Sequence, residues 1–195
     1  MPKEEHRFPE PTEAQVKLLK SLSTPPFKAV AERFEQTVSP PLGLMLELGR
    51  ELARGCDDHE TASRLSHEID GFDGVEVPPE RRVTAFASPF PVRALDMRLL
   101  DPEEVFLVNR EKFSQVQLSV GQPIAELETA LGELQSGGVL AMRVPASEIT
   151  AESADTDQDT EVYLYILPRE IQRVVEAARS LAVRSLCARL VEAAG

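Results

Sequence analysis

The chain has 195 residues, of which 42% are hydrophobic and 28% are charged, so it has enough apolar material to bury a domain core. Its net charge of −12 repels phosphate backbones and disfavours general nucleic-acid binding. Charged residues interrupt every apolar run well short of the about 20 residues that a helix needs to cross a bilayer. The N-terminus has no apolar leader and the two cysteines form no disulfide framework, so we expect a cytoplasmic protein without membrane association.

Residues 1–11 combine prolines with mixed charges and are expected to form a flexible lead. Two short helices follow within residues 12–41, the first capped by Thr12 and the second beginning at Phe27. A proline pair after each helix predicts that the helix ends there. The pattern leaves open whether this helical segment is an appended hairpin or the start of the core.

Two longer helices are predicted next. The first spans residues 42–54 and carries a leucine-rich face, and Gly55 is expected to end it in the left-handed conformation. Asp57 or Asp58 then caps the second helix, whose apolar residues recur at steps of three and four until Gly71 ends it. Because only a few residues join the two helices, they are expected to pack antiparallel as a hairpin.

Downstream of Gly74 the apolar residues tend to alternate with polar ones, as they do in half-buried strands. The predicted strands span residues 75–77, 83–86, 105–108, 116–120, 139–144 and 162–166. A helix is predicted over residues 124–135, and an acidic, solvated loop over residues 150–161. A long C-terminal helix is predicted from Pro168 to Ala194.

The C-terminal helix has one apolar face that is expected to point inward. Its members are Ile171, Val174, Val175, Ala178, Leu181, Ala182 and Leu186. Arg189 falls within this face and is expected to extend its charged end to solvent. Arg169, Arg173 and Arg184 lie on the polar face, which is either solvated, or a local anion-binding strip or partner contact.

Together these elements predict an α+β fold. A helical hairpin is expected to pack on a small, mainly antiparallel sheet, with the long C-terminal helix closing the arrangement. Residues 42–195 then form one domain, preceded by the helical segment at residues 12–41 and the lead at residues 1–11.

Three short stretches occur in an order that is typical of a known family. Residues 48–53 belong to a leucine-rich helix, the stretch from Glu68 to Phe72 (EIDGF) ends the next helix, and PPER follows at residues 78–81. This order resembles the AbiTii domain, a family of bacterial abortive-infection proteins that confer phage resistance. Counterparts of later family segments lie at residues 90–95, 124–128 and 171–190. The resemblance therefore covers most of residues 42–192.

The sequence also departs from the family pattern. Phe72 and Glu80 stand where tyrosines are usual. A tryptophan expected in the second helix and a Leu-Arg-Lys element expected in the first are missing. The resemblance implies a role in antiphage defence and does not imply a particular chemistry.

The connection at residues 71–82 is the candidate partner-binding site. Its candidate residues are Gly71, Phe72, Arg81 and Arg82. A glycine that ends a helix lets Phe72 fold back onto the apolar face of that helix. The two arginines can grip a carboxylate or a phosphate bidentately. The alternative is a structural salt bridge, for instance from Arg81 to Glu68 or Asp70.

Cys56 and the histidines that follow it do not make a catalytic or metal site. His59 and His67 are eight residues apart, about 12 Å along a helix, and point in different directions, so they cannot share one ion. The acidic residues after Cys56 disfavour a reactive thiolate. We therefore predict no catalytic residue, metal ligand or cofactor, and leave open carboxylate pairs that meet only in the folded chain.

The predicted function is that of a cytoplasmic antiphage protein of the AbiTii type, which acts through contacts with a protein partner or with itself. One alternative is a hydrolase or nuclease whose carboxylates assemble only in the fold. Another is a housekeeping adaptor. A cleft with convergent acids would favour an enzyme, whereas an exposed apolar patch would favour a binding protein.

Overall fold

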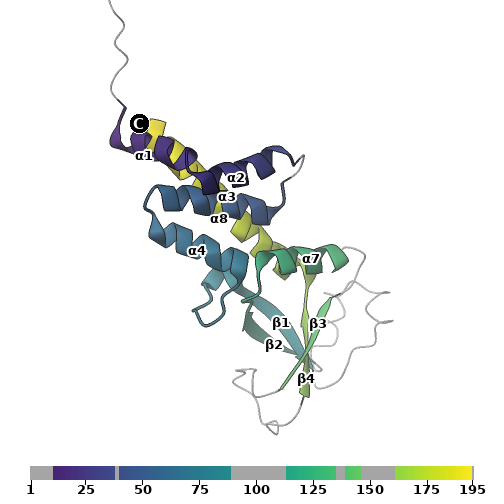
Figure 1. The fold of residues 1–195 in the computed structure, drawn as a ribbon. Coiled ribbons are helices and arrows are strands. Elements are labelled where there is room, and N and C mark those ends of the chain that lie inside the picture. The colour runs from purple at the N-terminus through teal and green to yellow at the C-terminus, as the bar shows by residue number, and fades with distance from the viewer. Residues whose placement is uncertain (1–10, 38–39, 89–112, 135–138, 146–160, 195) are drawn as a thin grey trace, which may run out of the picture. The chain divides into compact units, whose positions relative to one another are not determined.

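The structure is a computed structural model that describes residues 11–37, 40–88, 113–134, 139–145 and 161–194. These residues divide into two compact units, which we call the helical unit and the sheet unit (Figure 1). Among the described residues, the helical unit comprises 11–37, 40–69 and 179–194, and the sheet unit comprises 70–88, 113–134, 139–145 and 161–178. Helices and an antiparallel sheet together make the chain an α+β protein, as predicted.

Helix α1 (Glu13–Leu22) begins where the sequence predicts. The Thr12 hydroxyl accepts a hydrogen bond from the Gln15 amide at 3.2 Å, and the Gln15 side chain accepts one from the Thr12 amide at 2.8 Å. This reciprocal capping box satisfies two amides that have no partner within the helix.

Helix α2 (Pro25–Glu35) begins two residues earlier than predicted. Thr24 caps it by accepting a hydrogen bond from the Phe27 amide at 3.4 Å. Two prolines fill its first turn, where the missing N–H groups are not needed, so they start this helix as well as ending the one before. Both α1 and α2 pack on α3 (Leu42–Gly55), within the helical unit.

The turn between α3 and α4 (His59–Asp70) differs from the prediction. Gly55 is still helical, and Asp57 instead adopts the left-handed conformation, with a φ of +61°. Asp58 then caps α4 by accepting a hydrogen bond from a backbone amide at 3.1 Å. The prediction for Gly55 is wrong because this glycine serves close packing: a Cβ there would lie 2.4 Å from the Ser21 hydroxyl oxygen.

The core of the helical unit lies around α3. Its buried apolar side chains are Val30, Leu42, Leu44, Leu46, Leu52, Ala53, Ala62, Leu65 and Ala182. Gly49 allows close approach, since a Cβ there would lie 3.4 Å from the Leu65 side chain and 3.8 Å from that of Ser185. The C-terminal part of α8 (Pro168–Ala194) therefore packs closely against α3 in this unit.

The sheet unit holds four antiparallel strands in the order β2-β1-β4-β3. They are β1 (Arg82–Ser88), β2 (Ser114–Ser119), β3 (Leu140–Pro145) and β4 (Glu161–Ile166). Each overlaps a predicted strand, and α7 (Ile124–Leu134) and α8 also lie where helices are predicted. The predicted strand at residues 105–108 lies outside the described residues, as do residues 1–10 of the predicted lead and residues 150–160 of the predicted acidic loop.

The predicted strand at residues 75–77 is wrong. This segment forms a turn and an irregular stretch, followed by one turn of 3-10 helix, η1 (Pro79–Arg81). Gly74 has a φ of +72° and the Val75 side chain is 43% exposed, so the backbone bends here and no sheet covers the valine. Three alternating residues are too few to distinguish a strand from such a turn.

Both faces of the sheet carry buried apolar side chains. One face contributes Val83, Ala85, Val116, Leu164 and Ile166, which follow the alternation expected of strands. On the other face Phe86 lies directly opposite Tyr165 in the β1–β4 register. The Phe113 ring packs edge-on against Tyr165, with ring centroids 6.1 Å apart. The sheet is therefore apolar on both sides at the β1–β4 pair.

Helix α8 has the predicted apolar face. Five of the predicted inward residues are buried: Ile171, Val174, Val175, Ala178 and Ala182. Leu181 and Leu186 are only half-buried. No helix in the described part of the chain is both long enough and apolar enough to cross a membrane.

Candidate functional site

Gly71 and Phe72, two of the predicted partner-binding residues, directly follow α4. Gly71 has a φ of +96°, a left-handed conformation that ends the helix as predicted. The Phe72 side chain is buried, and its amide donates a hydrogen bond to the Gly121 carbonyl at 2.8 Å. A Cβ at Gly71 would lie 3.1 Å from that same carbonyl oxygen, so the two chain segments pass very close to each other.

Arg81 is buried, with only 2% of its surface exposed. Its guanidinium donates hydrogen bonds to the carbonyl oxygens of Gln122 at 2.8 Å and Val120 at 3.4 Å. It also lies over the Phe72 ring, 5.0 Å from the centroid. Carbonyl dipoles and a cation–π contact thus offset the cost of burying the cation. Arg81 joins residues 71–82 to the segment before α7, and its side chain is not presented to an external partner.

Arg82 has a different setting from Arg81. Its side chain is exposed at the first residue of β1. Its backbone carbonyl accepts a hydrogen bond from the Arg173 guanidinium. The structure therefore brings Gly71, Phe72 and Arg81 together in one buried cluster and leaves Arg82 at the surface.

Glu170 and Arg173, on the first turns of α8, bind the backbone of β1 and of the segment before it. The Glu170 carboxylate accepts a hydrogen bond from the Thr84 amide at 3.1 Å. The Arg173 guanidinium donates to the carbonyls of Arg82 and Glu80, the latter at 3.3 Å, and pairs with Glu170 at 3.5 Å. Helical spacing places Arg173 on a polar face but gives no sign of a backbone partner 91 residues away.

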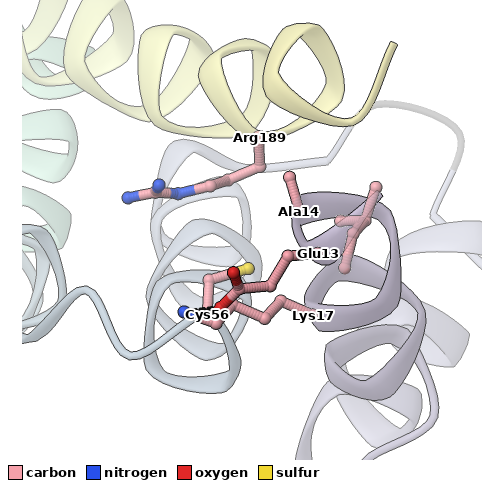
Figure 2. A pocket seen from close by; sticks show the side chains of 6 residues that line it. Glu13, Ala14, Lys17, Cys56 and Arg189 are labelled. Atoms are coloured by element: carbon pink, nitrogen blue, oxygen red, sulfur yellow. Dashed lines mark ion pairs between the residues drawn. The ribbon is translucent and has the colours of Figure 1, made fainter. Parts of the chain in front are cut away.

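A pocket of about 410 Å³ opens within the helical unit (Figure 2). Its lining residues are Glu13, Ala14, Lys17, Leu18, Cys56 and Arg189. In Figure 2, Arg189 comes from α8, Glu13 and Lys17 come from α1, and Cys56 comes from the end of α3. Glu13 and Lys17 pair with each other at 3.6 Å.

The pocket residues are engaged with neighbours. Arg189 forms an ion pair with Asp58, in which the two side chains are 17% and 22% exposed. This pair corrects the prediction that Arg189 extends to solvent. The Cys56 thiol lies 3.4 Å from the Ser21 hydroxyl, a group too weakly basic to activate it. Among the described residues, no group of three or more His, Cys, Asp or Glu is placed to hold a metal ion.

The outer face of α1 exposes apolar side chains. Val16 and Leu22 are each 37% exposed, and Leu19 is 59% exposed. A shallow groove of about 380 Å³ lies on this face, and we call it the α1 groove. Its lining residues are Val16, Leu19, Lys20, Ser23 and Thr24. These aliphatic side chains make the α1 groove a candidate interaction surface.

Comparison of the chain with models of protein families, with characterised proteins and with solved structures finds no match. The structure itself therefore defines the class: an α+β protein in which Arg81 is buried with Phe72 at the 71–82 connection and an apolar groove lies on α1. The relationship of residues 42–192 to the AbiTii family stays a prediction from the sequence.

Proposed function

We propose that the chain is an antiphage protein of the AbiTii type that acts in the cytoplasm through contacts with a protein partner. The colinear resemblance of residues 42–192 to the AbiTii family supports a role in antiphage defence. The α1 groove supports the mode of action. The observation that carries the proposal is the exposure of Leu19, which leaves 59% of an aliphatic residue accessible in the middle of a helix.

The α1 groove has the composition of a protein-binding surface. Apolar surface removed from water contributes about 25 cal/mol per Å², so burial of Leu19 and Val16 by a partner favours binding. Lys20 and Thr24 line the same groove and provide polar groups that fix the orientation of a partner. An apolar centre with a polar rim is the usual arrangement of a protein interface.

In this proposal most of the candidate residues of the 71–82 connection stabilise the fold and do not contact the partner. Phe72 and Arg81 are buried, so they stabilise the sheet unit. Arg82 is exposed and is the member of this group that is available to a partner.

Phage plating on bacteria that express the chain tests the proposal. The wild-type chain is expected to lower plaque numbers, and Leu19→Glu is expected to abolish this protection. Val183→Glu is the matched control, because Val183 is also an exposed aliphatic residue of the helical unit, at 42%. Thermal melts of the purified variants establish that both are folded.

Variants at the thiol and the imidazoles separate a binding protein from an enzyme. Cys56→Ala, His59→Ala and His67→Ala are expected to leave protection intact. Loss of protection in a folded Cys56→Ala or His59→Ala protein would favour an enzyme. Full protection by folded Leu19→Glu, or no protection by the wild-type chain, would contradict the proposed function.

A further inference from the structure

We infer that the α1 groove binds an amphipathic helical segment of a partner protein, with acidic residues beside its apolar face. The inference rests on the proposed function, because it names the chemistry of the partner for the same surface. It follows from the spacing of the exposed apolar residues, from the local charge and from the size of the groove.

The exposed apolar residues of α1 are spaced to receive a helix. Val16, Leu19 and Leu22 recur at steps of three residues along α1. Helices pack when rows of side chains at this spacing fit between one another, and a helix bound in a groove presents apolar anchors at similar steps. α1 is ten residues long, about 15 Å, so a partner helix of about three turns covers the row.

The groove lies in the lysine-rich part of an acidic chain. Three of the five lysines of the chain are Lys17, Lys20 and Lys28, on α1 and α2, whereas the whole chain has a net charge of −12. Lys17 forms an ion pair with Glu13, and Arg33 of α2 forms one with Glu47, so the positive charge at the groove comes from Lys20. Lys20 lines the groove itself. Acidic residues on the flank of a partner are attracted to this edge, and basic ones are repelled.

A second copy of the chain fits this face less well than a short segment. α1 is about 15 Å long and about 10 Å wide. Its face is much smaller than the about 800 Å² that each partner buries in a stable interface. Two chains that each carry a net charge of −12 also repel one another. A short helical segment needs only the small face of α1, and its acidic flank lies beside Lys20, which lines the groove.

Peptide selection on the purified full-length chain tests the inference. The probe is a displayed library of random peptides of about 16 residues, which is long enough for an isolated helix. The enriched peptides are expected to repeat apolar residues at steps of three and four, to carry net negative charge and to become helical on binding. Leu19→Glu is expected to weaken their binding by about tenfold or more, and the control Val183→Glu is expected to leave it unchanged.

Charge reversal tests the acidic flank separately from the apolar row. Lys20→Glu is expected to lower the affinity of the enriched peptides for the protein, because it replaces the attractive charge of the groove with a repulsive one. Versions of the same peptides with lysine in place of the flanking acidic residues are expected to recover affinity for the Lys20→Glu protein. Equal binding of both peptide versions to both proteins would overturn the assignment of the charge.

Several results would overturn the inference as a whole. These are enrichment of neutral or basic peptides, unchanged binding to Leu19→Glu, a dimer in light scattering that Leu19→Glu dissociates, and Leu19-dependent binding to anionic phospholipid vesicles. If such a result occurs while Leu19→Glu still abolishes protection in the plating assay, the proposed function stands and only the partner is wrong. If acidic helical peptides bind but Leu19→Glu leaves protection unchanged, the proposed function alone is overturned.

Discussion

The backbone amide of Thr84 donates a hydrogen bond to the carboxylate of Glu170, 86 residues further along the chain. β4 pairs with β1 only from Ala85 onward, because the chain turns into α8 after Leu167. At Thr84 the Glu170 side chain takes the place of a further strand partner. Arg173 does the same for the carbonyl of Arg82. Two side chains of α8 thus provide hydrogen-bond partners for backbone groups of β1 beyond the point where β4 ends.

Glu170→Ala is expected to lower the free energy of unfolding by about 1–2 kcal/mol, because the Thr84 amide loses its acceptor in a partly buried place. Glu170→Gln is the control, since the amide oxygen of glutamine still accepts this hydrogen bond and should retain most of the stability. Urea unfolding of the three proteins gives the comparison. Equal stability of Glu170→Ala and the wild-type chain would show that water replaces the carboxylate without cost.

Gly71→Ala is expected to destabilise the protein by about 1–3 kcal/mol, because a residue with a Cβ is strained at positive φ. The new Cβ would also lie 3.1 Å from the Gly121 carbonyl oxygen. Gly74→Ala is the matched variant: Gly74 has a φ of +72° but no atom within 4 Å of its Cβ position. Its cost should be the strain alone, about 1 kcal/mol. If the two thermal melts shift equally, crowding at Gly121 contributes nothing.

Gly55→Ala is expected to push α1 away from α3, because its Cβ would lie 2.4 Å from the Ser21 hydroxyl oxygen and 2.9 Å from the Ser21 Cα. We expect a loss of about 1–3 kcal/mol and faster hydrogen exchange of the α1 amides. Gly43→Ala, also on α3 but with nothing near its Cβ position, should be neutral or stabilising by up to about 1 kcal/mol. Unchanged exchange of α1 in Gly55→Ala would contradict the close crossing.

Arg81→Ala is expected to cost about 2–3 kcal/mol, because it leaves the buried carbonyl of Val120 and the partly buried carbonyl of Gln122 without their charged donor. Arg81→Lys should recover only part of this loss, since one ammonium group does not reproduce the planar fork of the guanidinium. Arg82→Ala is the exposed control and should stay within about 0.5 kcal/mol of the wild-type chain. Chemical denaturation measures all three. If Arg81→Ala is as stable as the wild-type chain, Arg81 is not structural and is again a candidate partner-binding residue.

The features that could be predicted from the sequence depend on residues close to one another in the chain. Thr12 and Asp58 cap their helices through amides three residues away, and Gly71 ends α4 through its own backbone conformation. Alternation along β1 and β4 identifies one buried face, with Val83, Ala85, Leu164 and Ile166, but it does not reveal that Phe86 and Tyr165 on the other face are buried too. Local chemistry of this kind leaves a direct trace in the sequence.

The features that could not be predicted depend on partners far apart in the chain. The acceptors of Arg81 are backbone carbonyls 39 and 41 residues away, and carbonyls have no signature in a sequence. The sequence does not distinguish Gly55 from Gly71, yet Gly55 allows close packing and Gly71 adopts a left-handed conformation. The adjacent pair Leu18 and Leu19 does not reveal which side chain faces the core. The α1 groove was therefore visible only in three dimensions.

The helical unit is built from two distant parts of the chain, so its core can be completed only near the end of synthesis. Residue 179 follows Ile69 by 110 positions, yet Ala182 is fully buried in this unit and Ser185 lies beside Gly49. At about 5–20 residues per second, a ribosome needs roughly 5–20 s to reach the last helix after it has completed α4. The nascent chain carries an unfinished helical core for that time, while residues 70–178 of the sheet unit are made without interruption.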